Sequence, residues 1–278
     1  MTALVSVLIP AHNEAGYIET CLEALFASDP LPDGAAAEVL VLANGCSDDT
    51  AQIARGLSAP EGWTCRVLEL PEGGKLGALN AGDAAAKGNV LVYLDADVIV
   101  SPPLLGQLTS ALAEEVPLYA SGSPRISPAR SLLTRAYGRF WAQLPFVTEG
   151  VPGFGLFAMN RAGRNRWQDW PDIISDDTFA RLSFAAPERI RLPGTYQWPM
   201  VEGFANLVRV RRRQNKGVEE IAAQFPQLLA NDDKRSLGSR GLLQLLRRDP
   251  LGFAAYGLVS LAVKTPLFKS KSRWARGR

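Results

Sequence analysis

Four strand patterns alternate with three helix patterns over the first hundred residues. Apolar, β-branched runs at residues 5–10, 38–42 and 89–97 are typical of buried parallel strands, and residues 64–70 alternate between apolar and polar side chains. The segments between them place apolar residues at helical spacing, with helices expected at residues 14–26, 47–57 and 75–86. This order predicts a doubly wound α/β sheet flanked by helices.

Beyond residue 100 the patterns are less regular. Helices are expected from residue 103 to about 115 and over residues 131–144, whereas residues 116–200 are rich in Pro, Gly and Trp. Residues 218–278 have helical patterns that end in a basic tail. We therefore expect an α/β domain over residues 1–217, made of two halves that meet near residue 100, followed by a helical basic extension.

Charge is distributed unevenly along the chain. The overall composition, 47% hydrophobic and 21% charged, is that of an ordinary globular protein, and the net charge is only +2. Residues 1–200 carry 14 Lys or Arg against 22 Asp or Glu, a net −8, whereas residues 201–278 carry 16 against 6, a net +10. The basic end suggests contact with phosphates, an anionic membrane surface or an acidic partner.

The cysteines and the first residues suggest a cytoplasmic protein. The three cysteines, Cys21, Cys46 and Cys65, are odd in number and lack metal-ligand spacing, which is typical of reduced thiols. The chain starts with a strand pattern rather than a basic leader followed by an apolar stretch. No apolar run approaches the roughly 20 residues of a membrane span.

Two carboxylates end the strand pattern at residues 89–97. Because side chains alternate along a strand, Asp95 and Asp97 can point the same way beyond its carboxyl end, where ligands of open α/β sheets bind. A hard divalent cation that also binds a substrate diphosphate would relieve their mutual repulsion. The alternative is a simple turn in which Asp97 caps the next helix.

Three further segments carry candidate chemistry. Residues 10–14, Pro-Ala-His-Asn-Glu, follow the first strand and could hold a nucleotide base, or form a turn with Asn13 as a helix cap. Lys75 follows two glycines at a helix start and could face a phosphate, although the segment fails the P-loop pattern. Asp176 and Asp177 precede a helical pattern and could cap it, or one could act as a general base.

These segments resemble, in order, the motifs of family 2 glycosyltransferases with the GT-A fold. The resemblance rests on residues 10–14, on Ala43-Asn44-Gly45-Cys46-Ser47-Asp48-Asp49-Thr50, on Lys75-Leu76-Gly77-Ala78-Leu79-Asn80, on Asp95-Ala96-Asp97 and on Ser175-Asp176-Asp177. It is dense over residues 4–100, thinner to about 217, and absent from the last sixty residues. It implies a Rossmann-like mixed sheet whose first half binds a nucleotide sugar and whose second half binds the acceptor.

The resemblance also implies roles for individual residues. Asp95 would lie by the ribose, and Asp97 would bind Mg²⁺ or Mn²⁺ held by the diphosphate. Asp177 would deprotonate the acceptor hydroxyl, supported by Asp176, with residues 153–155 bordering the acceptor. The remaining nucleotide-binding residues would be Pro10, Ala11, Asn13, Glu14, Asn44, Lys75 and Asn80.

The chain departs from the family pattern at two places. Ala43 stands where the family often has an acid that helps to hold the base, and the absence of this acid counts against a uridine donor. The resemblance still favours a UDP-sugar as donor, with a GDP-sugar as the alternative. The Q-x-x-R-W motif of processive members is missing, which favours transfer of one sugar per encounter. Arg212 lies in the basic run at residues 209–214 and could contact the diphosphate; alternatively, this run is a solvated helix face.

The last residues suggest a membrane surface. The apolar stretch at residues 251–259 precedes clustered cations, Lys264, Lys269, Lys271, Arg273, Arg276 and Arg278. Apolar residues beside cations suit the anionic leaflet of a cell membrane. The alternative is a helix that packs on the core and is followed by a basic tail.

The resemblance, together with the missing Q-x-x-R-W motif, implies a metal-dependent, inverting, non-processive glycosyltransferase. Its substrates would be a nucleotide-diphosphate sugar and a hydroxyl of a glycan or lipid-linked acceptor, with no nucleic acid as partner. One alternative is sugar transfer to polyprenyl phosphate. Two alternatives from other classes are a nucleotidyltransferase that releases pyrophosphate and a binding domain with an inactive site.

Overall fold

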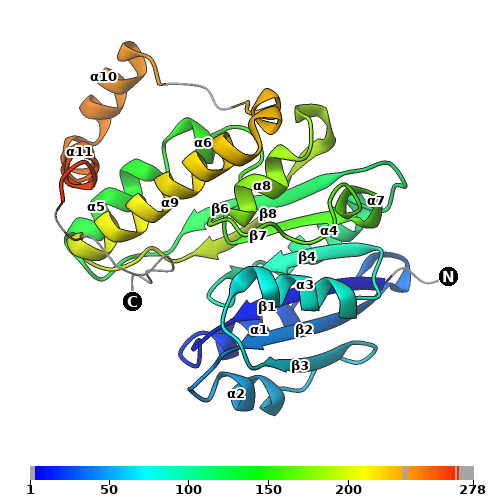
Figure 1. The fold of residues 1–278 in the computed structure, drawn as a ribbon. Helices are drawn as coiled ribbons and strands as arrows, with labels where there is room; N and C mark the ends of the chain where they lie inside the picture. Colours follow the sequence, from blue (N-terminus) through cyan, green and yellow to red (C-terminus); the bar gives the residue numbers. More distant parts are fainter. Residues whose placement is uncertain (1–3, 234–236, 267, 269–278) are drawn as a thin grey trace.

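The computed structural model describes residues 4–233, 237–266 and 268 of the 278. Its centre is a mixed eight-stranded sheet in the order β3-β2-β1-β4-β7-β6-β8-β5 (Figure 1). The predicted α/β class is therefore confirmed. The strands are β1 Leu4–Ala11, β2 Ala36–Asn44, β3 Thr64–Leu70, β4 Val90–Leu94, β5 Ile99–Val100, β6 Tyr119–Ile126, β7 Leu156–Asn160 and β8 Arg189–Trp198.

Helices cover both faces of the sheet. On β1, Val5, Val7 and Ile9 belong to the core shared with α1 and α4, whereas Leu8 belongs to the core shared with α3 and α8. This two-residue alternation explains why parallel strands buried on both faces are apolar throughout. The helices of at least seven residues are α1 Ile18–Phe26, α2 Thr50–Gly56, α3 Lys75–Ala85, α4 Leu104–Ala111, α5 Leu132–Trp141, α8 Asp176–Leu182, α9 Phe204–Gln224, α10 Ser239–Arg248 and α11 Pro250–Val263.

The first half of the sheet follows the sequence pattern closely. Strands β1, β2, β3 and β4 pair in parallel, so their carboxyl ends meet at one edge. The first helix begins at Ile18 rather than at residue 14, because the carbonyl of Glu14 accepts the N–H groups of Tyr17 and Ile18 in a turn.

The second half contains three strands that the sequence pattern did not mark. Strand β7 pairs antiparallel with β4 and β6, and β6 pairs in parallel with β8. Gly122 and Pro124 interrupt β6, Pro193 and Gly194 interrupt β8, and the β6–β8 register shifts after Ser121. Such irregular strands lack the continuous or alternating apolar pattern on which sequence assignment depends.

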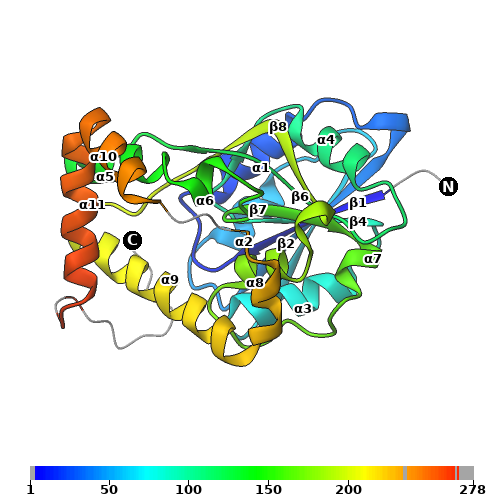
Figure 2. The same cartoon turned by 90° about the horizontal axis from the view of Figure 1, so that it is seen from above.

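A third apolar core joins the long helix α9 to α5 and α11 (Figure 2). The domain boundary expected at residue 217 falls inside α9, which runs on to Gln224. In the part of the chain that the structure describes, no helix is long and apolar enough to cross a membrane.

Two glycines of α3 provide a matched test of the packing between this helix and the sheet. A Cβ at buried Gly82 would lie 2.7 Å from methyl carbons of Leu8 and Leu42, whereas a Cβ at exposed Gly77 would meet nothing within 4 Å. We expect Gly82→Ala to lower the free energy of unfolding by about 1–3 kcal/mol through overpacking. Gly77→Ala should raise it by about 0.5–1 kcal/mol through helix propensity. Urea unfolding would measure both, and equal effects would contradict this packing.

Candidate active site

Two adjoining cavities form one cleft at the edge where the carboxyl ends of the parallel strands meet. The first has a volume of about 520 Å³ and is lined by Glu14, Asn44 and Asp97. The second has a volume of about 400 Å³ and is lined by Asp177 and the segment 152–155. Both are bordered by the same central residues, among them Pro10, Lys75, Asp95, Asp176, Trp141, Trp198, Arg211 and Arg213.

Lys75 forms an ion pair with two carboxylates at the junction of the cavities. Its Nζ lies 2.9 Å from Oδ1 of Asp95 and 2.9 Å from Oδ2 of Asp176. Burial disfavours the charged ammonium, but the attraction of Asp176 and Asp95 outweighs it and holds the pKa of Lys75 above its usual value. One cation therefore connects the start of α3, the end of β4 and the start of α8.

The two adjacent aspartates of α8 have different surroundings. Asp176 is only 4% exposed, and burial raises its pKa, although Lys75 opposes this effect. Asp177 lines the second cavity, and its Oδ1 accepts the N–H of Thr178 at 2.7 Å. Asp176 thus holds the ion pair, whereas Asp177 presents a carboxylate to the second cavity.

Helix α9 fixes the segment that leads into these aspartates. A Cβ at Gly217 would lie 2.1 Å from Oγ of Ser175, so only glycine allows α9 to approach this closely. One turn away, Oε2 of Glu220 accepts the N–H of Ile174 at 3.0 Å. The position of Asp176 and Asp177 therefore depends on a helix that comes later in the chain, beyond β8.

Asn44 organises the floor of the first cavity. Its Nδ2 donates to the carbonyls of Ala11 and Leu42 at 2.8 and 3.0 Å, and its Oδ1 accepts the N–H of Gly74 at 2.9 Å. These bonds hold the ends of β1 and β2 against the turn before Lys75. Only 2% of the surface of Asn44 is exposed, so its main role is to support the cavity floor.

Four of the predicted nucleotide-binding residues do not line either cavity. Ala11 is fully buried, and Asn13, at φ 54°, accepts the N–H of Ser47 at 2.7 Å. Asn80 accepts the N–H of Trp170 at 2.8 Å. Arg212 donates to the carbonyls of residues 262, 263 and 265 at the end of α11.

The arginines of α9 that do line both cavities are Arg211 and Arg213. The basic run in the sequence identified the helix but not the residues that face the cleft. The apolar residues Leu207 and Val210, together with Gln214, mark the cleft face at the three-to-four-residue spacing of a helix. That spacing was a signal available in the sequence.

An aromatic wall on the second half of the sheet was not predicted. The rings of Trp141 and Trp198 are stacked with centroids 5.4 Å apart, and Phe154 meets each at 5.0 Å. Gly155, at φ +78°, allows this contact, since a Cβ there would lie 2.5 Å from the Trp198 ring. Trp141 ends a helix that the sequence predicts, whereas Phe154 and Trp198 come from segments without a regular pattern, and only the folded chain brings the three rings together.

Residues 153–155 lead directly into strand β7. A Cβ at Gly153 would lie 2.0 Å from the hydroxyl of Tyr119. That hydroxyl is buried and has no hydrogen-bond partner among the described residues. Burial and the charge of Asp177 raise the pKa of Tyr119. Tyr119 thus supports the segment that borders the second cavity.

The donor set of the first cavity suits a cation shared with a ligand. In the described ranges, no three His, Cys, Asp or Glu side chains converge as a metal cluster. Asp95 and Asp97 both line the cavity. Mg²⁺ is usually bound by one or two carboxylates together with substrate phosphates and waters, so these two residues fit such an ion.

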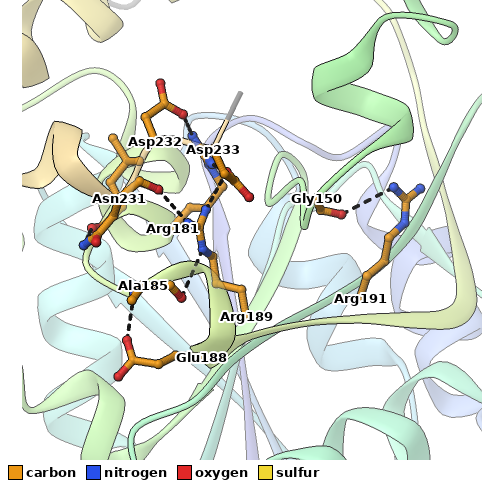
Figure 3. Close-up of polar contacts among 10 residues, drawn as sticks. Gly150, Arg181, Ala185, Glu188, Arg189, Arg191, Asn231, Asp232 and Asp233 are labelled. Carbon is orange, nitrogen blue, oxygen red and sulfur yellow. Dashed lines mark hydrogen bonds and ion pairs between the residues drawn. The ribbon is translucent and has the colours of Figure 1, made fainter. Parts of the chain in front are cut away.

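Two arginines bind Asp232 and Asp233 to α8 and to the start of β8 (Figure 3). Arg181 of α8 donates to Asp232 and Asp233 at 2.8 Å each, and Arg189 donates to Asp233 at 2.9 Å. Arg191 binds the segment before Gly153 through the carbonyl of Thr148 at 2.9 Å. These bonds stabilise the outer wall of the second cavity.

The mixed α/β sheet flanked by helices is the architecture of GT-A transferases, and known structures share this fold. A Pyrobaculum calidifontis mannosyltransferase, PcManGT, in complex with GDP-Man and Mn²⁺ is 22% identical, with a TM-score of 0.59 over 96% of this chain and 77% of that one. TarS of S. aureus in complex with UDP is 15% identical, with a TM-score of 0.55 over 96% and 76%.

The chain belongs to glycosyl transferase family 2, whose family model matches residues 6–184. Glucosyl-3-phosphoglycerate synthase of Mycobacterium tuberculosis is 36% identical over 102 residues, which are 36% of this chain and 31% of that protein. Glycosyltransferase AglD of Haloferax volcanii is 37% identical over 101 residues, 34% of this chain and 15% of that protein. The chain thus matches about a third or less of the length of these relatives.

Removing the cation at the junction should destabilise the fold. We expect Lys75→Met to lower the free energy of unfolding by about 2 kcal/mol or more at pH 7.5, because Asp176 is left buried and uncompensated. The deficit should shrink as the pH falls, since protonation neutralises the carboxylates. Lys75→Met with Asp176→Asn should recover most of the loss. If urea unfolding showed that the losses of the two single variants add up in the double variant, the ion pair would be contradicted.

Proposed function

We propose that this protein transfers a sugar from a nucleotide-diphosphate donor to an acceptor, with Mg²⁺ or Mn²⁺ and with inversion at the anomeric carbon. The observation that carries the proposal is the junction of two cavities at Lys75, Asp95 and Asp176. One cavity has the groups for a metal-bound diphosphate, and the other has a carboxylate for an acceptor. Family membership supports sugar transfer as the chemistry.

The donor half of this proposal uses the first cavity. Asp97 and Asp95 would hold the metal ion, and Arg211 and Arg213 in the cavity wall complement the charge of a diphosphate. When bound, the ion would stabilise the negative charge on the departing diphosphate. A UDP-sugar is favoured, and a GDP-sugar is the alternative; TarS and PcManGT were solved with UDP and GDP-Man.

The acceptor half uses the second cavity. Asp177 would remove the proton of the attacking hydroxyl, while Asp176 would keep Lys75 and the start of α8 in place. A base in the second cavity and a leaving group in the first would lie on opposite sides of the junction. In-line displacement with inversion requires such an arrangement. A single acceptor hydroxyl, on a glycan or a lipid-linked sugar, would be glycosylated per encounter.

One observation favours a second candidate acceptor. The second cavity is lined by four cations, Lys75, Arg181, Arg211 and Arg213, which would also suit the phosphate of a polyprenyl phosphate. A phosphate oxygen is already a nucleophile at neutral pH and needs no general base. A nucleotidyltransferase is disfavoured, because Ala-His-Asn-Glu stands where such enzymes carry a glycine-rich, basic loop.

Nucleotide titration tests the donor assignment. We expect calorimetry with UDP, GDP, CDP and ADP to detect binding of one nucleotide that strengthens at least tenfold with Mn²⁺. Asp97→Asn should remove the Mn²⁺ effect while the chain stays folded by circular dichroism, because Asp97 would contribute a metal ligand. Asp29→Asn, at an exposed loop carboxylate, is the control. Equal affinity with and without Mn²⁺ in the unaltered chain would exclude the metal assignment.

Asp177→Asn separates the two acceptor classes. For a hydroxyl acceptor, kcat should fall about 10²–10⁴-fold with nucleotide affinity unchanged, because the general base is lost. For a phosphate acceptor the same variant should retain most of its kcat. Asp169→Asn, at an exposed carboxylate outside both cavities, should match the unaltered chain. Loss of nucleotide binding in Asp177→Asn would contradict its place on the acceptor side.

A further inference from the structure

Helices α10 and α11 lie at one edge of the molecule (Figures 1 and 2) and expose apolar side chains. Six of the twelve large apolar side chains exposed in the described residues lie on these two helices: Leu242, Leu243, Leu246, Leu251, Leu258 and Leu261. Three of them, Leu251, Leu258 and Leu261, are 72%, 55% and 64% exposed. An apolar surface this concentrated usually marks an interaction site.

Helix α11 differs from an ordinary surface helix. Residues 250–263 contain no charged side chain. Ala255, Val259 and Ala262 are buried in the core shared with α5 and α9. The opposite stripe, at residues 251, 254, 258 and 261, repeats every three to four residues and is exposed and apolar. A helix that is apolar on both faces needs a second apolar environment on its outer side.

The charges around this surface identify that environment. Residues 237–278 carry nine Lys or Arg and one acid, Asp249, which pairs with Arg139 at 3.2 Å. Arg240, Arg247 and Arg248 are exposed on α10, and Lys264 is exposed just after α11. The five cations at positions 269, 271, 273, 276 and 278 lie outside the described residues. Apolar stripes bordered by cations match the interface of a bilayer with anionic headgroups.

A second copy of the chain fits this surface poorly. A two-fold contact would bury the same patch of each copy, so the cations that border the patch would gather at one interface from both copies. Like charges at a closed interface oppose association. We propose that α10 and α11 form a docking surface for an anionic lipid bilayer.

Docking would hold the cleft close to the lipid. The ring of Tyr256, on α11, stacks on Tyr137 with centroids 5.5 Å apart, and its hydroxyl accepts a hydrogen bond from Arg211 at 3.1 Å. Tyr137 and Arg211 both line the first cavity. The bilayer would therefore lie about one helix layer, roughly 10 Å, behind a wall of the cleft. This inference concerns location and stands apart from the proposed sugar transfer.

Vesicle sedimentation of the full chain tests the proposal. We expect binding to vesicles of phosphatidylcholine with phosphatidylglycerol, weak binding to phosphatidylcholine alone, and release at high salt. Arg247→Gln with Arg248→Gln should weaken binding about fivefold for each charge removed. Equal binding to neutral and anionic vesicles, or no binding to either, would overturn the proposal.

A matched pair of variants tests the apolar stripe. Leu258→Gln with Leu261→Gln should reduce vesicle affinity at least tenfold, whereas Val116→Gln should not change it. Val116 is 57% exposed on the loop between α4 and β6, outside α10 and α11. Thermal unfolding followed by circular dichroism would confirm that each variant is folded. Unchanged vesicle binding of the double leucine variant would contradict the docking surface.

Hydrogen exchange of the unaltered chain gives a readout that needs no variant. Anionic vesicles should slow amide exchange within residues 239–263, with little change in β1 and β2. Protection elsewhere, without protection of α10 and α11, would overturn the assignment. Light scattering without lipid tests whether a second copy of the chain covers the surface instead. A dimer of the unaltered chain that becomes a monomer in the Leu258→Gln, Leu261→Gln variant would overturn the proposal.

Discussion

The ion pair of Lys75 with Asp95 and Asp176 is the interaction on which the cleft depends. Two carboxylates from distant parts of the chain would repel each other at the junction of the cavities if no cation lay between them. Lys75 supplies that cation from the first residue of α3. It thereby fixes the distance between the segment after β4, which carries Asp97, and α8, which carries Asp177.

The surrounding structure holds each member of the ion pair in place. Asn44 binds the turn before Lys75, and the carbonyl of Gly155 accepts the N–H of Asp95. Gly217 lets α9 press against Ser175, next to Asp176. The same helix α9 lines the cleft with Arg211 and packs against α11. The proposed membrane surface and the proposed catalytic centre are thus opposite faces of one helical layer.

The sequence predicted the first half of the sheet well and the second half poorly. Strands β1 to β4 are apolar runs buried on both faces, and the cleft residues Glu14, Lys75, Asp95 and Asp97 follow directly from their ends. Strands β6 and β8 carry internal Gly and Pro, so their partners, and the stacking of Trp141 on Trp198, arise only from tertiary pairing. Arg212 shows the same limit. The basic run located the helix, but which of its arginines face the cleft depends on how α9 packs against α11.

The most direct test of this account is a crystal structure with UDP or GDP and Mn²⁺. The account predicts an anomalous manganese peak beside the carboxylate of Asp97, with the diphosphate in the first cavity and no nucleotide in the second. A nucleotide in the cavity lined by Asp177, or a manganese site away from Asp95 and Asp97, would contradict the assignment of donor and acceptor sides.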